Sequence, residues 1–284
     1  MYIIMKIGFL YSLLRKDEKL LMDEFRSRNI EFVMIDDRSI VLSPETTLDV
    51  DCVYERSISF SRGLEVIRIL ESLGIRCINS HATSEICGNK IATTLALKKV
   101  NIQQPEVRFA FTEESALKAI DELGYPIVIK PPVGSWGRLL AKINDRDAAE
   151  AILEHKATLG SYQHSLFYVQ EYIEKKGRDI RSFVIGNECV AAAYRESSHW
   201  ITNAARGAQA TFCPVTDEIA ELSIKSAQAV KGEIIAIDIF ESERGLLVNE
   251  INHSMEFKAS QSAQSAEFNI PKMIVDYLIS EVKV

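Results

Sequence analysis

The sequence Val248-Asn249-Glu250-Ile251-Asn252-His253-Ser254-Met255-Glu256-Phe257-Lys258 follows Ile237-Asp238-Ile239-Phe240 after a short loop, and these two stretches are the most informative part of the chain. Residues 234–240 and 246–251 are rich in β-branched side chains, and the loop between them ends in glycine. Apolar β-branched runs separated by such a loop are typical of a β-hairpin. The sequence therefore predicts a hairpin near the C-terminal end.

Three side chains with oxygen atoms fall together on this predicted hairpin. Adjacent strands bring Asp238 close to Glu250 and Asn252, and the last two point to the same face because side chains alternate along a strand. Two carboxylates and an amide oxygen are hard ligands of the kind that hold Mg²⁺ beside substrate phosphates. The spacing proposes a Mg-nucleotide site, although on this feature alone a solvated hairpin face is the commoner arrangement.

The composition is that of a soluble globular protein. The chain has 284 residues, which exceeds one average domain, with 47% hydrophobic and 26% charged residues. No apolar run approaches the roughly 18 residues that cross a bilayer, and the apolar start leads into charged residues 15–19, so we predict a first buried strand and not a signal peptide.

Cysteine usage and charge narrow the setting further. The five cysteines are dispersed and lack the spacing of a metal site, which indicates reduced thiols in a cytoplasmic protein. The net charge of -7 argues against a nucleic-acid partner, and nothing in the sequence predicts a membrane partner.

Strand and helix patterns alternate over residues 1–89 and predict a small parallel α/β sheet. The dinucleotide motif G-x-G-x-x-G is absent. Further along, residues 127–130 and 139–143 predict two strands that flank a glycine-containing loop, residues 131–138. A hairpin of this kind differs from the strand-loop-helix of a P-loop, so the common NTPase fold is not expected.

Two lysines and one loop suit a phosphate group. Lys130 ends a buried strand, and Lys90 opens a helix, where its charge opposes the positive end of the helix dipole unless an anion lies nearby. The loop Gly134-Ser135-Trp136-Gly137 lets backbone N–H groups approach phosphate oxygens. A plain β-turn is the commoner role of such a loop, and the strand at residues 170–173, which can read an adenine edge, is ordinary by itself.

Four arginines and one polar loop lie in the second half of the chain. Arg178, Arg181, Arg195 and Arg206 offer planar forks for carboxylate or phosphate, and the alternative is that each pairs with a surface acid. In the loop at residues 199–207, Asn203 can join a metal or phosphate shell.

Together these features resemble the ATP-grasp ligases, in the branch shared by ribosomal-protein S6 glutamate ligases and amino-group-carrier ligases. The residues that carry the resemblance are, in order, Lys90, Lys130, Gly134 to Arg138, Gln170-Glu171-Tyr172, Gly177 to Arg181, Asp238, Glu250 and Asn252. Within the branch, residues 134–142, 199–203, 240–243 and 252–258 look most like LysX-type ligases, which join α-aminoadipate to the carrier protein LysW.

The resemblance implies a mixed α/β ATP-grasp fold. It implies an N-terminal parallel α/β domain at residues 1–89, a central subdomain at 90–175, and a C-terminal subdomain at 176–284 that carries the metal and substrate sites. It implies ATP-dependent ligation of the α-amino group of α-aminoadipate to the γ-carboxyl of the C-terminal glutamate of an acidic LysW-type carrier, through an acyl phosphate, in lysine biosynthesis. We also expect a homo-oligomer, either a dimer or a tetramer.

The resemblance further assigns a role to each matching residue. ATP would contact Lys90, Lys130, Gly134, Ser135, Trp136, Gly137, Arg138, Leu139, Leu140, Gln170, Glu171, Tyr172, Ile173, Arg178 and Asn203. Two Mg²⁺ ions would bind Asp238, Glu250 and Asn252. The amino-acid substrate would contact Arg195, Met255, Glu256, Phe257, Lys258, Ala259 and Ser260, with Arg195 and Lys130 acting in catalysis.

Three alternatives stay open from the sequence. Ala259-Ser260 departs from the Asn and small residue typical of LysX-type ligases and also from the Gly-Phe of their arginine-pathway relatives, so glutamate is the alternative substrate. A second alternative is a glutamate ligase that acts on another acceptor, such as ribosomal protein S6 or a small-molecule cofactor. The third is a non-catalytic nucleotide-binding subunit, against which the intact Asp238, Glu250, Asn252 and Lys130 set speaks.

Overall fold

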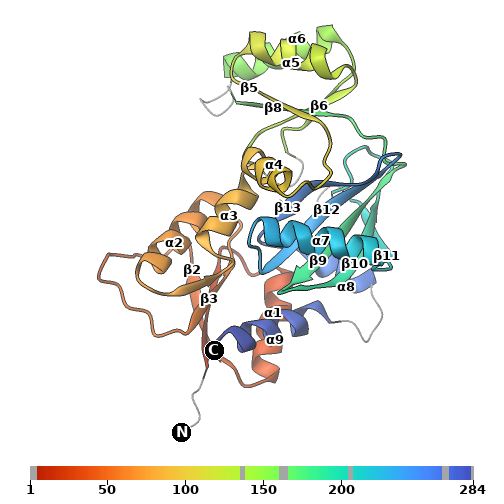
Figure 1. Cartoon of the computed structure of the whole chain (residues 1–284). Coiled ribbons are helices and arrows are strands. Elements are labelled where there is room, and N and C mark those ends of the chain that lie inside the picture. Colours follow the sequence, from red (N-terminus) through yellow and green to blue (C-terminus); the bar gives the residue numbers. More distant parts are fainter. Residues whose placement is uncertain (1–4, 135–137, 160–165, 204–206, 264–268, 283–284) are drawn as a thin grey trace.

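The computed structural model describes residues 5–134, 138–159, 166–203, 207–263 and 269–282. It contains three β-sheets, each covered by helices (Figure 1). Among the described residues, no helix is both long enough and apolar enough to span a membrane. All five cysteines are buried free thiols, as their dispersed spacing predicts.

The N-terminal sheet is parallel, as the alternating pattern predicts. Its strands are β1 (Lys6–Tyr11), β2 (Glu31–Asp36), β3 (Cys52–Arg56) and β4 (Arg76–Ile78), in the order β2-β1-β3-β4. Alternate side chains of the sheet pack on opposite faces, with Phe9 and Tyr54 in one apolar cluster and Leu10 and Val53 in another. Helix α1 (Lys16–Ser27) covers the first face and α2 (Phe60–Ser72) covers the second.

The second sheet is antiparallel and follows two consecutive helices, α3 (His81–Gly88) and α4 (Lys90–Lys99). Its strands are β5 (Val107–Ala110), β6 (Ile127–Lys130), β7 (Ala141–Ile143) and β8 (Phe167–Glu171), in the order β5-β8-β6-β7. Helices α5 (Glu113–Leu123) and α6 (Arg146–Leu159) lie together on one side of it (Figure 1). The opposite face is left to line a cavity.

The third sheet is also antiparallel and holds the predicted C-terminal hairpin. Its strands are β9 (Arg178–Ile185), β10 (Glu188–Glu196), β11 (Gln209–Cys213), β12 (Ile234–Ser242) and β13 (Gly245–Asn252), in the order β11-β10-β9-β12-β13. Helix α7 (Asp217–Ala229) covers one face. The other face packs on α9 (Ile270–Val282), which reaches back to α1.

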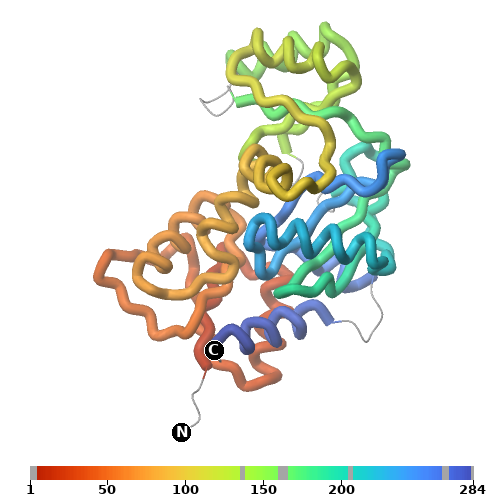
Figure 2. The backbone as a smooth tube through the Cα atoms, in the orientation of Figure 1, coloured from red at the N-terminus to blue at the C-terminus, as the bar shows by residue number. Residues whose placement is uncertain are grey.

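Helix α9 packs the C-terminal part of the chain against its N-terminal part. In Figure 2 the C-terminal segment lies against the N-terminal part of the molecule. Side chains from α9, such as Ile274 and Leu278, share one core with Phe9 of β1 and Phe183 of β9. The N-terminal sheet and the third sheet are therefore held on a common apolar cluster, which fixes the walls of the space between them.

The hairpin prediction is confirmed, and its register adds one feature. Asp238 lies opposite Glu250, and Ala236 lies opposite Asn252. Between Asp238 and Ile239 the register shifts, so Asn249 has no direct partner on β12. A bulge of this kind changes the direction of the extra side chain.

Several boundaries differ from the sequence prediction. The strand expected from residue 139 begins at Ala141, because Leu139 has a left-handed backbone with φ of 58°. Strand β8 ends at Glu171, two residues before the predicted end. Strand β11 and the short helices α3 and α8 (Lys258–Ala263) were not predicted, since none of them shows a clear apolar period.

Candidate active site

Two adjoining cavities lie where the sheets meet. The first is lined by Lys90, Val128, Lys130, Gly134, Leu140, Gln170, Tyr172, Ile173, Lys175, Asp179, Arg195, Trp200, Ile201, Asn203, Asp238, Phe240, Asn249 and Glu250. The second is lined by Arg15, Ser57, Ile58, Phe60, Cys87, Gly88, Gly134, Arg181, Arg195, Asn203, Asp238, Glu250, Ile251, Asn252, His253, Ser254 and Glu256. Gly134, Arg195, Asn203, Asp238 and Glu250 line both. These five residues form the junction of the two cavities.

Lys130 occupies the inner wall of the first cavity. It is the last residue of β6, and its Nζ donates hydrogen bonds to Gln170 Oε1 and Asn249 Oδ1, both at 2.8 Å. Burial lowers the pKa of Lys130 to about 7, against an opposing effect of the Glu250 charge. A lysine held in this way by neutral oxygens can receive an anion without first breaking an ion pair.

Lys90 faces the same cavity from the start of α4. Asn89 caps this helix, with its side-chain oxygen accepting from the backbone N–H groups of Ile91 and Ala92. The Lys90 Nζ donates to the Gly134 carbonyl at 2.8 Å and lies 3.7 Å from Glu250 Oε1. The cap and these two contacts place the Lys90 ammonium group at the junction, beside Gly134.

Asp238 is the most strongly paired acid of the junction. It accepts two hydrogen bonds from Arg181, at 2.8 and 2.9 Å, and lies 3.0 Å from Arg195 Nη2. Burial would raise the pKa of Asp238, but the charges of Arg181 and Arg195 outweigh burial and hold this pKa below its usual range. Asp238 is therefore charged at neutral pH.

Arg195 is shared between two acids. Besides Asp238, it donates two hydrogen bonds to Asp179, at 2.7 and 2.8 Å. Asp179 in turn accepts from Thr202 Oγ1 and lies 3.6 Å from Lys175 Nζ. Burial is the largest effect on the pKa of Lys175 and lowers it. The chain thus builds a buried row of alternating charges along the floor of the first cavity.

The predicted metal ligands fit a hard cation at the junction. Glu250 lines both cavities, and Asn252 lines the second. The Asn252 Nδ2 is buried and has no hydrogen-bond partner in the described structure. The oxygen and nitrogen of an amide exchange on rotation, so this side chain can present its oxygen to a metal ion without breaking a bond. Among the described residues there is no group of three or more His, Cys, Asp or Glu side chains that could hold a metal ion, so a metal bound by the predicted ligands would have two carboxylates and one amide as donors.

Part of the lining of the first cavity is apolar or aromatic. These side chains are Val128, Leu140, Tyr172, Ile173, Trp200 and Phe240. A pocket with such a lining and a few polar groups suits a flat heterocycle. Glu171 does not join it, because its carboxylate pairs with Arg244 and accepts from the backbone of Glu106.

Several residues predicted for the nucleotide lie elsewhere. Arg178 donates two hydrogen bonds to Glu241 and lies 4.0 Å from the centre of the Tyr194 ring, outside the lining of both cavities. Arg138 and Leu139 are exposed and also lie outside the lining. Ser135, Trp136 and Gly137 fall outside the described residues.

The segment predicted to contact the amino-acid substrate, residues 255–260, also lies mostly outside the two cavities. Of residues 255–260, Glu256 alone lines a cavity. Met255 and Phe257 point into the core between the N-terminal and third sheets, as apolar side chains bury when the chain offers a core. Lys258 and Ala259 are exposed, and Ser260 is buried in α8.

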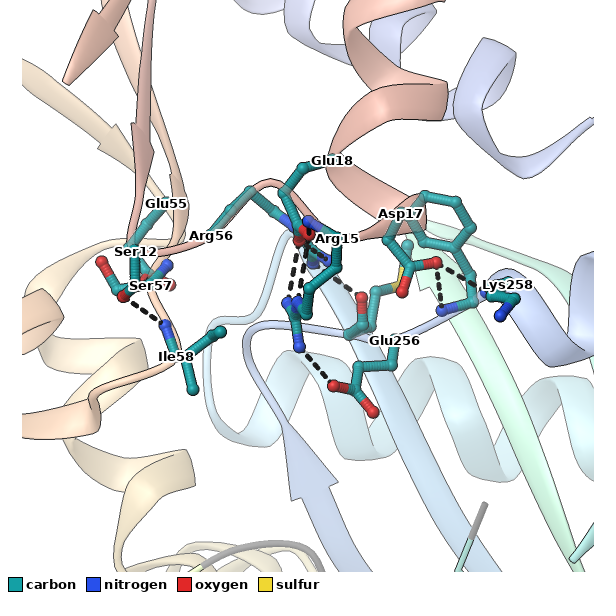
Figure 3. Close-up of polar contacts among 12 residues, drawn as sticks. Ser12, Arg15, Asp17, Glu18, Glu55, Arg56, Ser57, Ile58, Glu256 and Lys258 are labelled. Atoms are coloured by element: carbon teal, nitrogen blue, oxygen red, sulfur yellow. Dashed lines mark hydrogen bonds and ion pairs between the residues drawn. The ribbon is translucent and has the colours of Figure 1, made fainter. Parts of the chain in front are cut away.

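The N-terminal unit fixes this segment from the other side. Figure 3 shows Arg56 and Arg15 converging on Glu18, with Arg15 continuing to Glu256. Arg56 also donates to the Met255 carbonyl at 2.6 Å, and the backbone N–H of Lys258 donates to Asp17 at 2.7 Å. The segment after β13 is therefore positioned by residues far away in the sequence.

The sequence interpretation missed Lys175, Asp179, Asn249 and Arg15. Asn249 stands inside the stretch that predicted the hairpin, but regular alternation would turn it away from Glu250, and the bulge is not visible in the sequence. Arg15 belongs to a charged run that reads as a solvated helix start, so no local pattern marks it.

Comparison with known proteins gives a consistent result. Residues 87–278 match the model of the RimK-like ATP-grasp domain, and residues 7–86 match that of the LysX preATP-grasp domain. The chain is 36% identical over 274 residues to the α-aminoadipate–LysW ligase LysX of Saccharolobus solfataricus, covering 95% of this chain and 99% of the relative. It is 33% identical over 278 residues to the glutamate–LysW ligase ArgX of Sulfurisphaera tokodaii, covering 96% of this chain and 98% of the relative.

A solved structure has the same fold. The RimK domain ATP-grasp protein of Sphaerobacter thermophilus superposes with a TM-score of 0.78 at 24% identity, covering 96% of this chain and 99% of that chain. This confirms the mixed α/β ATP-grasp fold that the sequence predicts. Enzymes of this kind generally use ATP and Mg²⁺. The chain belongs to the RimK-like ATP-grasp family of ligases.

Proposed function

We propose that this enzyme joins the α-amino group of α-aminoadipate to the γ-carboxyl of the C-terminal glutamate of a LysW-type carrier protein, with release of ADP and phosphate in lysine biosynthesis. Similarity to LysX over nearly the whole chain supports this reaction. The single observation that carries the proposal is the junction of the two cavities, where Asp238, Glu250 and Arg195 line both. A nucleotide in one cavity and an amino acid in the other would meet there.

The first cavity suits ATP. We place the adenine among Val128, Tyr172 and Ile173 and the phosphates toward Lys130 and Lys90, because apolar and aromatic side chains suit a base and the two ammonium groups suit anionic oxygens. Mg²⁺, when held by Glu250, Asn252 and Asp238, would neutralise phosphate charge. We propose two ions, and their binding requires Arg181 to give up one of its two hydrogen bonds to Asp238.

The reaction needs positioning more than it needs a protein nucleophile. An oxygen of the carrier's γ-carboxylate attacks the γ-phosphorus of ATP and ADP leaves. The α-amine nitrogen then attacks the acyl carbon, phosphate leaves, and the amine proton passes to solvent. Lys130 and Lys90 would hold the phosphates in line for the first step, and Arg195, fixed by Asp179, would face the acyl phosphate at the junction.

Glutamate is the second candidate substrate. Similarity to the ArgX ligases, at 32–33% identity, favours it almost equally. The segment that differs between the two kinds of ligase holds Ala259 and Ser260 here, and neither lines a cavity. Chain-length selection is therefore assigned to residues of the second cavity.

Two further features belong to this proposal. We propose domain limits at residues 1–89, 90–175 and 176–284, each of which contains one of the three sheets. We also propose a homo-oligomer, a dimer or a tetramer, in the cytoplasm.

The test is ADP release by the purified enzyme with Mg-ATP, a LysW-type carrier and α-aminoadipate, with each component omitted in turn. The proposal expects release only when all are present. Release with glutamate but not with α-aminoadipate would replace the first candidate by the second. Release that needs ribosomal protein S6 in place of the carrier would refute both, and tight ATP binding without turnover under any condition would indicate a non-catalytic subunit.

A further inference from the structure

Arg15 stands in the wall of the second cavity and comes from the N-terminal unit. Its Nε and Nη2 donate to Glu18 at 3.0 and 2.8 Å, and its Nη1 donates to Glu256. Arg15 and Glu256 both line the cavity, whereas Glu18 does not. One edge of the guanidinium is thus fixed to the protein, and the other holds a carboxylate that is open to the cavity.

The fixed edge is firmly anchored. Glu18 and Arg56 are both fully buried, and Arg56 donates to Glu18 Oε1 at 3.2 and 2.9 Å. Because Glu18 keeps this second arginine, Arg15 is oriented by a group that does not depend on it. A pre-oriented guanidinium loses little side-chain entropy on binding a ligand. The arrangement visible in Figure 3 therefore presents Arg15 to the cavity in one direction.

The partner of Arg15 that is open to water is Glu256. Its side chain is 34% exposed, in contrast to the fully buried Glu18. An ion pair that is partly open to water contributes little to stability, so a carboxylate that enters the cavity can replace Glu256 at low cost. Glu256 occupies the position that a ligand carboxylate would take.

Neighbouring residues complete the chemistry of the subsite. Ser57 lines the same cavity, although its hydroxyl oxygen is inaccessible to solvent and interacts with the Glu55 carboxylate. Ile58 and Phe60 add apolar surface beside it. The wall suits a carboxylate at the end of a short methylene chain.

Three arginines line the described part of the second cavity, and two of them already pair with Asp238. Arg181 and Arg195 stand against Asp238 at or near the junction with the first cavity. In the proposed reaction the α-amine must reach this junction, so the α-carboxylate stays close to it. The side-chain carboxylate then extends away from the junction, toward the walls that only the second cavity has.

We propose that Arg15 binds the side-chain carboxylate of the dicarboxylic amino-acid substrate by displacing Glu256. This inference rests on the proposed function. It makes Arg15 and Glu256 specificity-determining residues, and it assigns selection against monocarboxylic amino acids to the N-terminal unit.

The test compares α-aminoadipate with norleucine, which has the same carbon chain without the second carboxylate. For the wild type, Arg15→Met, Arg15→Lys and Glu256→Gln, kcat and KM are measured for the amino acid, the carrier and ATP. Arg26→Met is the matched control, because Arg26 pairs with exposed Asp23 and lines neither cavity. Circular dichroism compares the fold of each variant with that of the wild type.

Arg15→Met is expected to raise the KM for α-aminoadipate by about 10- to 100-fold, as expected for loss of a charge-assisted contact. The KM values for ATP and carrier should stay within about twofold of the wild-type values. The preference for α-aminoadipate over norleucine should become smaller. The KM of Arg15→Lys for α-aminoadipate should lie between the wild-type value and the Arg15→Met value. Glu256→Gln should lower the KM for α-aminoadipate by roughly threefold, since it removes the competing carboxylate.

Other outcomes would overturn the inference. An unchanged preference for α-aminoadipate over norleucine in folded Arg15→Met would overturn it. A rise in the KM for the carrier alone would also overturn it, because this result would place the carrier's own terminal carboxylate at Arg15. A higher KM in Glu256→Gln would contradict the displacement. If the wild type itself ligates neither α-aminoadipate nor glutamate, the proposed function fails first and this inference with it.

Discussion

Lys130 Nζ donates a hydrogen bond to Asn249 Oδ1 at 2.8 Å, so one ammonium group ties the second sheet to the C-terminal hairpin across the first cavity. The contact exists because the bulge between Asp238 and Ile239 leaves Asn249 without a partner on β12. The side chain of Lys130 is therefore held in position by neutral amide oxygens before any nucleotide binds.

Replacement of Lys130 should separate a catalytic role from a structural one. Lys130→Met is expected to lower kcat/KM for ATP by about 100-fold or more, because a buried ammonium that faces the phosphates is lost. Steady-state ADP release measures this value. Lys118→Met, on an exposed position of α5, is the control and should match the wild type. Activity within a few-fold of the wild type in Lys130→Met would remove Lys130 from the phosphate site.

The pKa of Lys130 predicts proton uptake on ATP binding. Burial lowers this pKa to about 7, so at pH 8 the free enzyme holds Lys130 largely neutral. Bound phosphates favour the charged form and raise the pKa, so the complex binds a proton that the free enzyme lacks. Titration calorimetry at pH 8, in buffers of different ionisation enthalpy, should give a positive proton uptake. Lys130→Met should abolish it, and equal uptake in both proteins would contradict the assignment.

Glu250 should matter for activity and hardly for folding. Its side chain is 24% exposed and its nearest charged partner, Lys90, lies at 3.7 Å, so Glu250→Gln should cost less than about 1 kcal/mol of stability. Ligation should fall by roughly 1000-fold, because the proposed metal loses one of its two carboxylates. Thermal unfolding and ADP release measure the two effects. Near-normal ligation would refute the metal assignment.

Asp238 should behave differently, because it is buried between two arginines. Asp238→Asn leaves Arg181 and Arg195 without part of their counter-charge, and we expect a loss of about 3 kcal/mol of stability as well as of activity. This corresponds to a fall of roughly 6–12 °C in Tm. An unchanged Tm would show that Arg195 relies on Asp179 alone.

Much of the fold was predictable because its determinants are local. The strand at Ile127–Lys130 was predicted to the residue, since its apolar run ends at a lysine. The C-terminal hairpin follows from two β-branched runs and a loop that ends in glycine. Elements without such patterns, such as β11, with four of its five residues outside the core, could not be predicted.

The cavity-lining residues were predictable where they stand on the hairpin, at a strand end or at a helix start, or repeat a family pattern. Lys90, Lys130, Asp238 and Glu250 meet at the cavities, but Arg178 pairs with Glu241 instead, a contact across two strands that no local pattern reveals. Arg15 reaches Glu256 over 241 positions of sequence separation. Contacts of this range depend on how the N-terminal sheet and the third sheet share one core, which periodicity does not specify.

The most direct test of the account is intact-mass analysis of a LysW-type carrier after incubation with the enzyme, Mg²⁺ and ATP, with α-aminoadipate and glutamate offered in separate reactions. The carrier is expected to gain the mass of one α-aminoadipate less one water, and only when ATP is present. A carrier of unchanged mass with both amino acids, from folded and ATP-binding enzyme, would contradict it.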